Sequence, residues 1–280
     1  DCPESRGLGD VYKRQLVYLA YTAQDFQNGN HERLSVFYWN GTNLGNEQIL
    51  HIVGAAGIHN GSRLLILPDN TLLMSTGDLG DGGVSSQSDN NDNGKILRFN
   101  LDGSVPSDNP DPTSFIYTKG HRNSQGLCVG PNGIIYSSEH GQYNSDEFNI
   151  IEAGRNYGWP NVEGVCDGIC DWCNSGAEES FCLANNIVEP LKTWSPCAAV
   201  HDLIYYDHPA IPEWQGSVLM AVLGGFSSPI GGRLEVLSMS EDGLTLEESD
   251  MFFTEFNQRI RDVAVNPNTG AIYLAFNGPS

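Results

Sequence analysis

The stretch RLLILPDNTLLMSTGD, residues 63–78, contains two apolar runs separated by the tripeptide Pro-Asp-Asn. Proline fixes its own φ, and Asn accepts the left-handed backbone that a tight turn requires. The two apolar runs have the length of strands and are too short for ordinary helices. The stretch therefore predicts a β-hairpin whose turn lies at residues 68–70.

The same pattern recurs twice along the chain. GLCVGPNGIIYSSEHG (126–141) carries a Pro-Asn-Gly turn, and DVAVNPNTGAIYLAF (262–276) carries a Pro-Asn-Thr-Gly turn. The turn prolines are separated by 63 and 136 residues, which is one and two multiples of about 65. Three further stretches also predict strands, namely residues 16–23, 95–106 and 218–228. A recurring hairpin in an all-β chain favours a β-propeller, whereas a β-sandwich does not predict the repeat.

The length of the chain limits the number of propeller blades. With about 60 residues per blade, residues 16–280 supply four to five blades, which is few for a closed ring. Residues 1–15, DCPESRGLGDVYKRQ, differ in character from the rest of the chain and resemble a translated, non-native adapter. We therefore expect a partial propeller over residues 16–280 whose N-terminal portion is missing.

Acidic side chains dominate the charge. The 280 residues carry a formal net charge of −21 with 39% apolar residues, which is enough for a core. This acidity disfavours nucleic acid and anionic membranes as partners, since both repel it. No apolar run approaches the roughly 18 residues of a membrane span.

Cysteines concentrate in a segment without strand-like alternation, at about residues 163–190. It contains Cys166, Cys170, Cys173 and Cys182, with Cys197 soon after. Disulfides in an oxidising compartment explain the cluster best, while a metal site or free thiols are the alternatives. Cys128 lies in an apolar run and is expected in the core.

Scarce basic side chains gather at predicted strand ends. His59 precedes one strand, Arg122 and Asn123 precede another, and Arg259 and Arg261 lie two residues apart in QRIRDV. Residues two apart in a strand share a face, and Arg pairs bidentately with carboxylates and phosphates. The pattern indicates a multiply anionic ligand, although each arginine could instead pair with one of 35 acidic side chains.

Several stretches in the same order resemble one known family. They are GIHNGSRLLILPDNTLLMSTGDLG, GKILRFNLDGSVPSDNP, YTKGHRNSQGL, SSEHGQYNSDEFNIIEAGRNYGWPNV and QRIRDVAVNP. Together they resemble the soluble PQQ-dependent glucose/sorbosone dehydrogenases, also called aldose sugar dehydrogenases. The resemblance implies a six-bladed β-propeller with pyrroloquinoline quinone (PQQ) and Ca²⁺ over its central channel.

The resemblance also implies a role for individual residues. His59 matches the general base, Arg122, Asn123, Arg259 and Arg261 match cofactor contacts, Gly141 and Gln142 match carbonyl ligands of calcium, and Trp194 matches an aromatic residue beside the cofactor. A neutral imidazole can take the proton of the sugar C1 hydroxyl while hydride moves to the quinone C5. Arg122 can then stabilise negative charge on the reduced quinone oxygen.

The chain departs from the family at four places. Ile58 replaces an acidic residue that often precedes the histidine, and Leu79 replaces a Gln. Gln142 replaces a calcium-binding Pro, which should be tolerated because only the carbonyl is needed. Residues 222–233 contain no lysine where glucose-active members have one. These differences predict weaker cofactor binding or a different subgroup.

These observations favour a periplasmic or secreted aldose dehydrogenase that passes electrons to an external acceptor. The alternatives are a calcium-dependent propeller lactonase and a propeller that binds a ligand without catalysis. A lactonase needs carboxylates that converge on the metal, and only Asp146 and Glu147 are candidates. Both are expected to support a loop instead. The preferred sugar does not follow from the sequence.

Overall fold

Seventeen strands form five antiparallel sheets in the computed structural model, which describes residues 15–25, 29–168, 177–225 and 230–277. The first two sheets are β1 (Gln15–Asp25), β2 (Gly29–Trp39) and β3 (Leu44–Gly54), then β4 (Gly61–Ile66), β5 (Thr71–Thr76), β6 (Lys95–Asn100) and β7 (Ile116–Lys119). The third is β8 (Ser124–Val129), β9 (Ile135–Glu139), β10 (Asp146–Ile151) and β11 (Lys192–Trp194). The last two are β12 (Val200–Tyr206), β13 (Ser217–Val222), β14 (Arg233–Met239) and β15 (Leu246–Phe252), then β16 (Ile260–Val265) and β17 (Ile272–Phe276).

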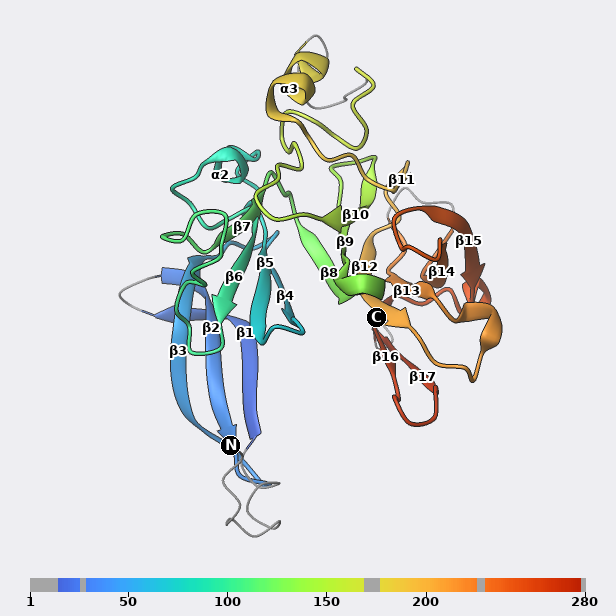
Figure 1. Ribbon diagram of the computed structural model, residues 1–280, viewed down its shortest axis with the longest axis horizontal. Coiled ribbons are helices and arrows are strands. Elements are labelled where there is room, and N and C mark those ends of the chain that lie inside the picture. The colour runs from blue at the N-terminus through green and yellow to red at the C-terminus, as the bar shows by residue number, and fades with distance from the viewer. Residues whose placement is uncertain (1–14, 26–28, 169–176, 226–229, 278–280) are drawn as a thin grey trace.

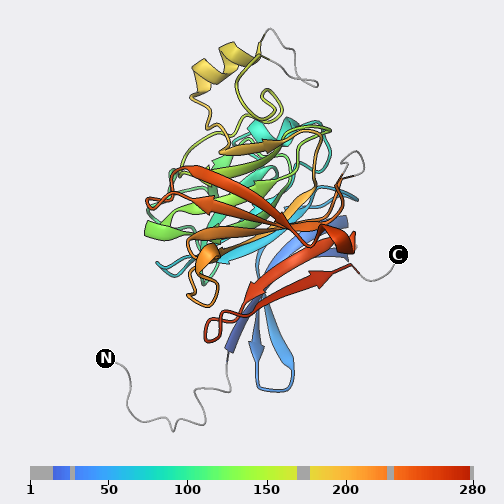
Figure 2. The same cartoon turned by 90° about the vertical axis from the view of Figure 1, so that its right-hand side faces the viewer.

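Helices are few and short. Among the described residues, the α-helices are α2 (Val84–Gln87) and α3 (Glu178–Asn185), and the 3₁₀ turns are η1 (Pro131–Gly133), η2 (Pro212–Trp214) and η3 (Thr254–Phe256). Both views show α3 projecting away from the sheets (Figures 1 and 2). In the part of the chain that the structure describes, no helix is both long and apolar enough to cross a membrane.

The sheets follow one another in chain order around the molecule (Figure 1). The first strand of each sheet contacts the first strand of the next, from β1 to β4, then β8, β12 and β16. In a propeller the first strands of the sheets surround the axis, and this chain has that arrangement. The arrangement therefore favours the propeller over the β-sandwich. The prediction of an all-β propeller is confirmed at the level of architecture. A six-bladed ring and its incompleteness remain predictions.

The predicted hairpins are present at all three turns. Asn70 and Asn132 have φ of 63° and 56°, and Gly270 has φ of 69°, so the turns use the left-handed backbone that their sequences favour. Leu67 N–H donates to the Thr71 carbonyl at 2.8 Å and closes the first turn. Local turn chemistry thus sets the register of β4–β5, β8–β9 and β16–β17.

Four apolar clusters fill the spaces between consecutive sheets. The three consecutive apolar residues of β5 illustrate this packing: Leu72 and Met74 pack toward the first sheet, while Leu73 packs toward the third. Alternate side chains leave opposite faces of a strand, and both faces of this sheet are covered. Cys128 lies in the next cluster, as predicted for a core residue.

Glu32 is an ionisable residue in the buried interior, and its protonation should affect the stability of the fold. Its side chain is fully buried, Ser62 donates to Oε1, and Oε2 has no hydrogen-bond partner among the described residues. Burial raises the pKa of Glu32 to about 7, although the Ser62 hydrogen bond opposes the shift. The folded protein therefore keeps a proton that the unfolded chain releases near pH 4.

We expect Glu32→Gln to stabilise the fold by about 2–3 kcal/mol at pH 8, because the amide carries no charge to desolvate. The advantage should shrink as pH falls toward about 4, where the wild-type carboxyl is protonated in both states. Urea unfolding between pH 4 and 8 measures it. Glu248→Gln, an exposed change on β15, serves as control. Parallel pH curves for wild type and Glu32→Gln would contradict the prediction.

Candidate functional site

One rim of the propeller carries most of the predicted functional residues. His59 and Arg122 lie shortly before the first strands β4 and β8, and Gly141 follows the second strand β9. In an antiparallel sheet the start of a first strand and the end of a second strand lie at the same edge. Consecutive sheets therefore bring these segments to one rim. They line a cavity of about 400 Å³ with Arg259, which precedes β16.

His59 is held by a buried carboxylate. Its Nδ1 lies 2.6 Å from Asp78 Oδ1, and Asp78 is 1% exposed. Burial favours the neutral acid, but hydrogen bonds from His59, Gly80 N–H and Trp159 outweigh it and lower the pKa of Asp78. An ionised Asp78 only accepts hydrogen bonds, so Nδ1 carries the proton and Nε2 is left as the basic nitrogen.

Backbone packing fixes this pair. Residues before β4 lie against residues after β5, where Leu79 N–H donates to the His59 carbonyl at 3.3 Å. A Cβ on Gly77 would lie 1.9 Å from the same carbonyl oxygen, so position 77 requires glycine. His59 itself has φ of 54°, which is unusual outside glycine and is seen where the surroundings enforce it.

Arg122 is buried beside this pair. Its Nε and Nη2 donate to Gln142 Oε1 at 3.0 and 2.6 Å, and Nη1 donates to the His140 carbonyl at 3.3 Å. The guanidinium carbon also lies 5.4 Å from the Trp159 ring centroid, within the range of a cation–π contact. Burial lowers the pKa of Arg122, although Asp78 opposes the shift. Arginine nevertheless stays charged in proteins.

Carboxylates also hold the loop after β9. Gly141 N–H donates to Asp146 Oδ1 at 2.9 Å, and Gln142 N–H donates to Glu163 Oε1 at 3.3 Å. The second oxygen of Asp146 accepts N–H donors from Ala199 and Val200. A Cβ on Gly141 would lie 1.9 Å from the Asn144 carbonyl oxygen, which explains the glycine. Asp146 thus supports the loop, as predicted.

Five described arginines form ion pairs with carboxylates, and three do not. Those with a carboxylate within 4.0 Å are Arg33, Arg63, Arg98, Arg155 and Arg233. The guanidinium groups without such a partner among the described residues are those of Arg122, Arg259 and Arg261. In a chain of net charge −21, arginines whose guanidinium groups form no ion pair leave local positive charge for an anionic ligand.

Three predicted site residues do not line the cavity. The side chain of Asn123 is buried and accepts a hydrogen bond from Gln125 at 2.9 Å. Arg261 is exposed and donates to Asn277 Oδ1 at 2.6 Å. A register shift between Ile260 and Asp262 breaks the alternation expected to place Arg259 and Arg261 on one face.

Trp194 lies apart from the cavity as well. It lines a separate cavity of about 260 Å³ with Lys192 and Glu235, and its Nε1–H donates to Glu235 at 3.1 Å. The indole that does contact the His59–Asp78 pair is Trp159, from the NYGWPNV stretch.

The sequence did not identify several other residues of the site. Asp78 ends the stretch predicted as the first hairpin, and Trp159 lies in a predicted loop, but neither position indicated a role. His140 and Cys197 also line the cavity, and Cys197 carries a free thiol. Burial and Asp146 raise the pKa of the Cys197 thiol. Proximity to a strand end was the signal that could have singled out Asp78 and His140.

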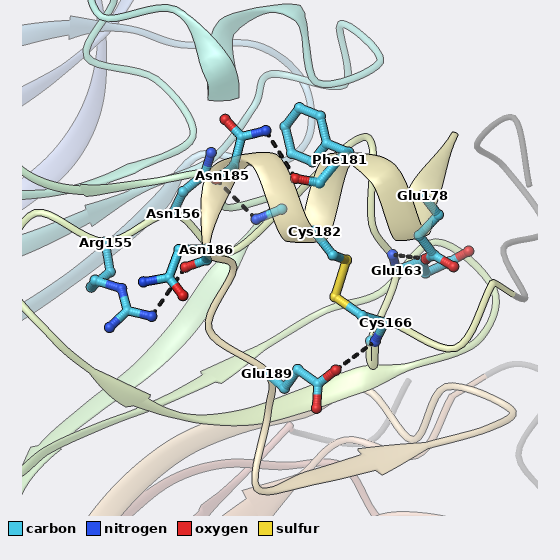
Figure 3. Close-up of a disulfide and its surroundings, with 12 residues drawn as sticks. Arg155, Asn156, Glu163, Cys166, Glu178, Phe181, Cys182, Asn185, Asn186 and Glu189 are labelled. Atoms are coloured by element: carbon cyan, nitrogen blue, oxygen red, sulfur yellow. Dashed lines mark hydrogen bonds between the residues drawn. A yellow bond between two sulfur atoms is a disulfide. The ribbon is translucent and has the colours of Figure 1, made fainter. Parts of the chain in front are cut away.

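A disulfide closes the segment beyond the rim. Cys166 and Cys182 form a disulfide that ties α3 to the preceding loop (Figure 3). The buried Glu178 of α3 accepts the N–H of Glu163 at 3.4 Å, and Glu163 in turn holds Gln142. The prediction of a disulfide in this cluster is confirmed, while Cys170 and Cys173 lie outside the described residues.

Comparison with known proteins gives a consistent result. The family model for glucose/sorbosone dehydrogenases matches residues 7–280. An uncharacterised Synechocystis protein is 33% identical over 94% of the chain and 64% of its own length. Quinoprotein glucose dehydrogenase B of Acinetobacter calcoaceticus is 36% identical over 77% of the chain and 58% of its length. The chain thus spans less than two thirds of these curated relatives.

Solved structures agree with the sequence comparisons. The PQQ-bound aldose sugar dehydrogenase of Streptomyces coelicolor aligns with a TM-score of 0.71 and 29% identity. The alignment covers 95% of this chain and 70% of that one. The apo aldose sugar dehydrogenase of Escherichia coli, with a TM-score of 0.78 and 22% identity, supports the fold.

The Asp78 carboxylate should contribute measurably to stability. We expect Asp78→Asn to destabilise the protein by about 2–3 kcal/mol at pH 7, because an amide cannot accept from all three donors. The pKa of Asp78 is lowered in the folded state, so its contribution exists above the unfolded pKa near 4 and disappears as pH falls through the folded value.

Urea unfolding at pH 7 and pH 3 tests both statements. The difference between wild type and Asp78→Asn should shrink at the lower pH. Asp111→Asn makes the same chemical change in an exposed turn and should cost less than about 1 kcal/mol. Equal losses for the two variants would contradict the role given to Asp78.

Proposed function

Because the chain belongs to the glucose/sorbosone dehydrogenase family, we propose that it oxidises an aldose at C1 to the lactone. The reaction uses PQQ and Ca²⁺ and passes electrons to an external acceptor. One observation carries the proposal: Arg122 and Arg259, whose guanidinium groups form no ion pair among the described residues, line the same cavity as the Asp78-bound His59. A basic nitrogen and an anion site thus lie together.

The cavity fits an anionic quinone. Its volume of about 400 Å³ falls within the roughly 300–1,000 Å³ of small-molecule sites. Burial, followed by repulsion from Arg261, lowers the pKa of Arg259, and bound carboxylates would relieve that repulsion. Arg122 and Arg259 would hold PQQ, with Arg261 within electrostatic reach.

The loop after β9 fits calcium. Calcium prefers oxygen ligands, including backbone carbonyls. Glu163 accepts the N–H of Gln142, which orients the peptide unit that carries the Gly141 carbonyl. Asp146 accepts the N–H of Gly141 and holds the preceding peptide unit. No group of three or more His, Cys, Asp or Glu side chains suited to a metal occurs among the described residues. We propose that the carbonyls of Gly141 and Gln142 serve as ligands.

The residues of this chain divide the chemistry between them. When bound, PQQ supplies the hydride acceptor and calcium polarises it. His59 Nε2 accepts the proton of the sugar C1 hydroxyl, while Asp78 holds Nδ1–H and stabilises the imidazolium that results. Arg122 supplies positive charge where negative charge develops during the reaction, and its buried position strengthens that effect.

The disulfide supports an oxidising compartment. Bonds such as Cys166–Cys182 persist in the periplasm and outside the cell, and they are rare in reducing cytosol. We propose that the protein works in one of these places, where sugars and diffusible acceptors are available to it.

The proposed reaction predicts dye reduction that requires PQQ, CaCl₂ and an aldose together. His59→Ala should lower kcat by about 10²–10⁴-fold, because the general base is lost, while PQQ binding persists. His208→Ala, a change near the opposite rim, should leave the rate unchanged. No dye reduction with any aldose in a panel would contradict the function. Full activity in His59→Ala would contradict the mechanism.

The anion site gives a second prediction. Arg259→Ala should weaken PQQ binding at least about tenfold, since a charge-assisted contact is lost. Arg155→Ala should not, because Arg155 pairs with Glu152 at 2.9 Å and does not line the cavity. Titration of the apo-protein with PQQ in CaCl₂, followed by quinone absorbance, measures both. Equal affinities for the two variants would exclude Arg259 from the site.

A further inference from the structure

Trp159 contacts both halves of the site. Its Nε1–H donates to Asp78 Oδ2 at 2.9 Å, opposite the oxygen that binds His59. The face of the same ring lies against the Arg122 guanidinium, at 5.4 Å from its carbon to the ring centroid. The residue is 5% exposed, so both contacts are shielded from water. Shielding strengthens a cation–π contact and a hydrogen bond to a carboxylate.

Neighbouring residues fix the position of this indole. Trp159 N–H donates to the Gly120 carbonyl at 3.0 Å, and its own carbonyl accepts from Gln87 Nε2 at 2.7 Å. Gln87 and Asn156 exchange a pair of side-chain hydrogen bonds at 3.1 and 2.8 Å. Because the backbone of Trp159 is held on both sides, the ring extends from a fixed point toward Asp78 and Arg122.

We propose that Trp159 is a positioning residue that fixes the position of His59 relative to Arg122. It acts on His59 through Asp78, and it contacts Arg122 directly. The role of Trp159 in catalysis rests on the proposed function. Its role in holding the His59–Asp78 pair and Arg122 in place does not depend on which reaction the protein catalyses.

The groups around Asp78 determine how the hydrogen bond between His59 and Asp78 responds to pH. His59 and Arg122 are the ionisable groups that face it from the neighbouring segments, and Gly80 N–H and Trp159 are its neutral donors. Removing the indole N–H takes away one hydrogen bond to the ionised form. Asp78 should then take up a proton at higher pH, and the His59–Asp78 contact should be lost earlier on acidification.

Two substitutions separate the two contacts. Trp159→Phe removes the N–H but keeps an aromatic face beneath Arg122. Trp159→Leu removes both. Trp214→Phe is the matched control, because Trp214 lies in a different cavity beside Phe252 and contacts neither His59 nor Arg122.

The first experiment uses the apo-protein and needs no turnover. With ¹⁵N-labelled histidine, the Nδ1–H of His59 should give a downfield proton signal, assigned by its loss in His59→Ala. We expect this signal to disappear on acidification about one pH unit higher in Trp159→Phe than in wild type and in Trp214→Phe. An unchanged midpoint in Trp159→Phe overturns the proposal, whatever reaction the protein catalyses.

The second experiment uses the protein loaded with PQQ and calcium. In Trp159→Phe the acidic limb of kcat/KM should move upward, with a loss of about tenfold at pH 4 and about threefold at pH 8. PQQ affinity should fall at least about fivefold more in Trp159→Leu than in Trp159→Phe. A loss of activity that is uniform with pH, or equal PQQ affinities in the two variants, overturns the coupling. Absence of any wild-type turnover would instead count against the proposed function, and the apo-protein result would still decide the role of Trp159.

Discussion

The buried carboxylate of Asp78 is the constraint on which the site depends. It receives hydrogen bonds from three separate segments of the chain: the loop before β4, the turn after β5 and the loop that carries Trp159. Its own backbone N–H donates to the Arg122 carbonyl at 2.8 Å, which adds a fourth segment. An ion in this position is costly to bury unless every oxygen is satisfied, so these segments are held in one arrangement.

The distribution of charge complements this arrangement. A protein with 35 acidic and 14 basic side chains would be expected to neutralise each arginine locally. Five described arginines follow that expectation, yet Arg122 and Arg259 line the cavity without an ion-pair partner among the described residues. The acidic surface repels most anions at long range, so binding of the proposed anionic cofactor would depend on short-range fit within the cavity.

The extent to which sequence predicted this structure depends on the range of the interactions. Turns at Pro68, Pro131 and Pro267 depend on neighbouring residues, so the hairpins could be predicted. His59 and Arg122 could be identified at predicted strand ends and Gly141 through the family resemblance, and the structure brings the three together. The partnership of Asp78 with Trp159 spans 81 residues and could not be predicted locally. The register shift beside Arg261 depends on pairing with β17, which no local pattern encodes.

The antiparallel sheets also separate the two rims of the propeller. The three proline-containing turns, which join first strands to second strands, lie at the rim opposite the cavity. Residues there set strand register without touching the reacting groups. This rim is consequently the natural place for peptide tags, surface immobilisation or coupling to an electrode, since a molecule held there would present its cavity outward to the solution.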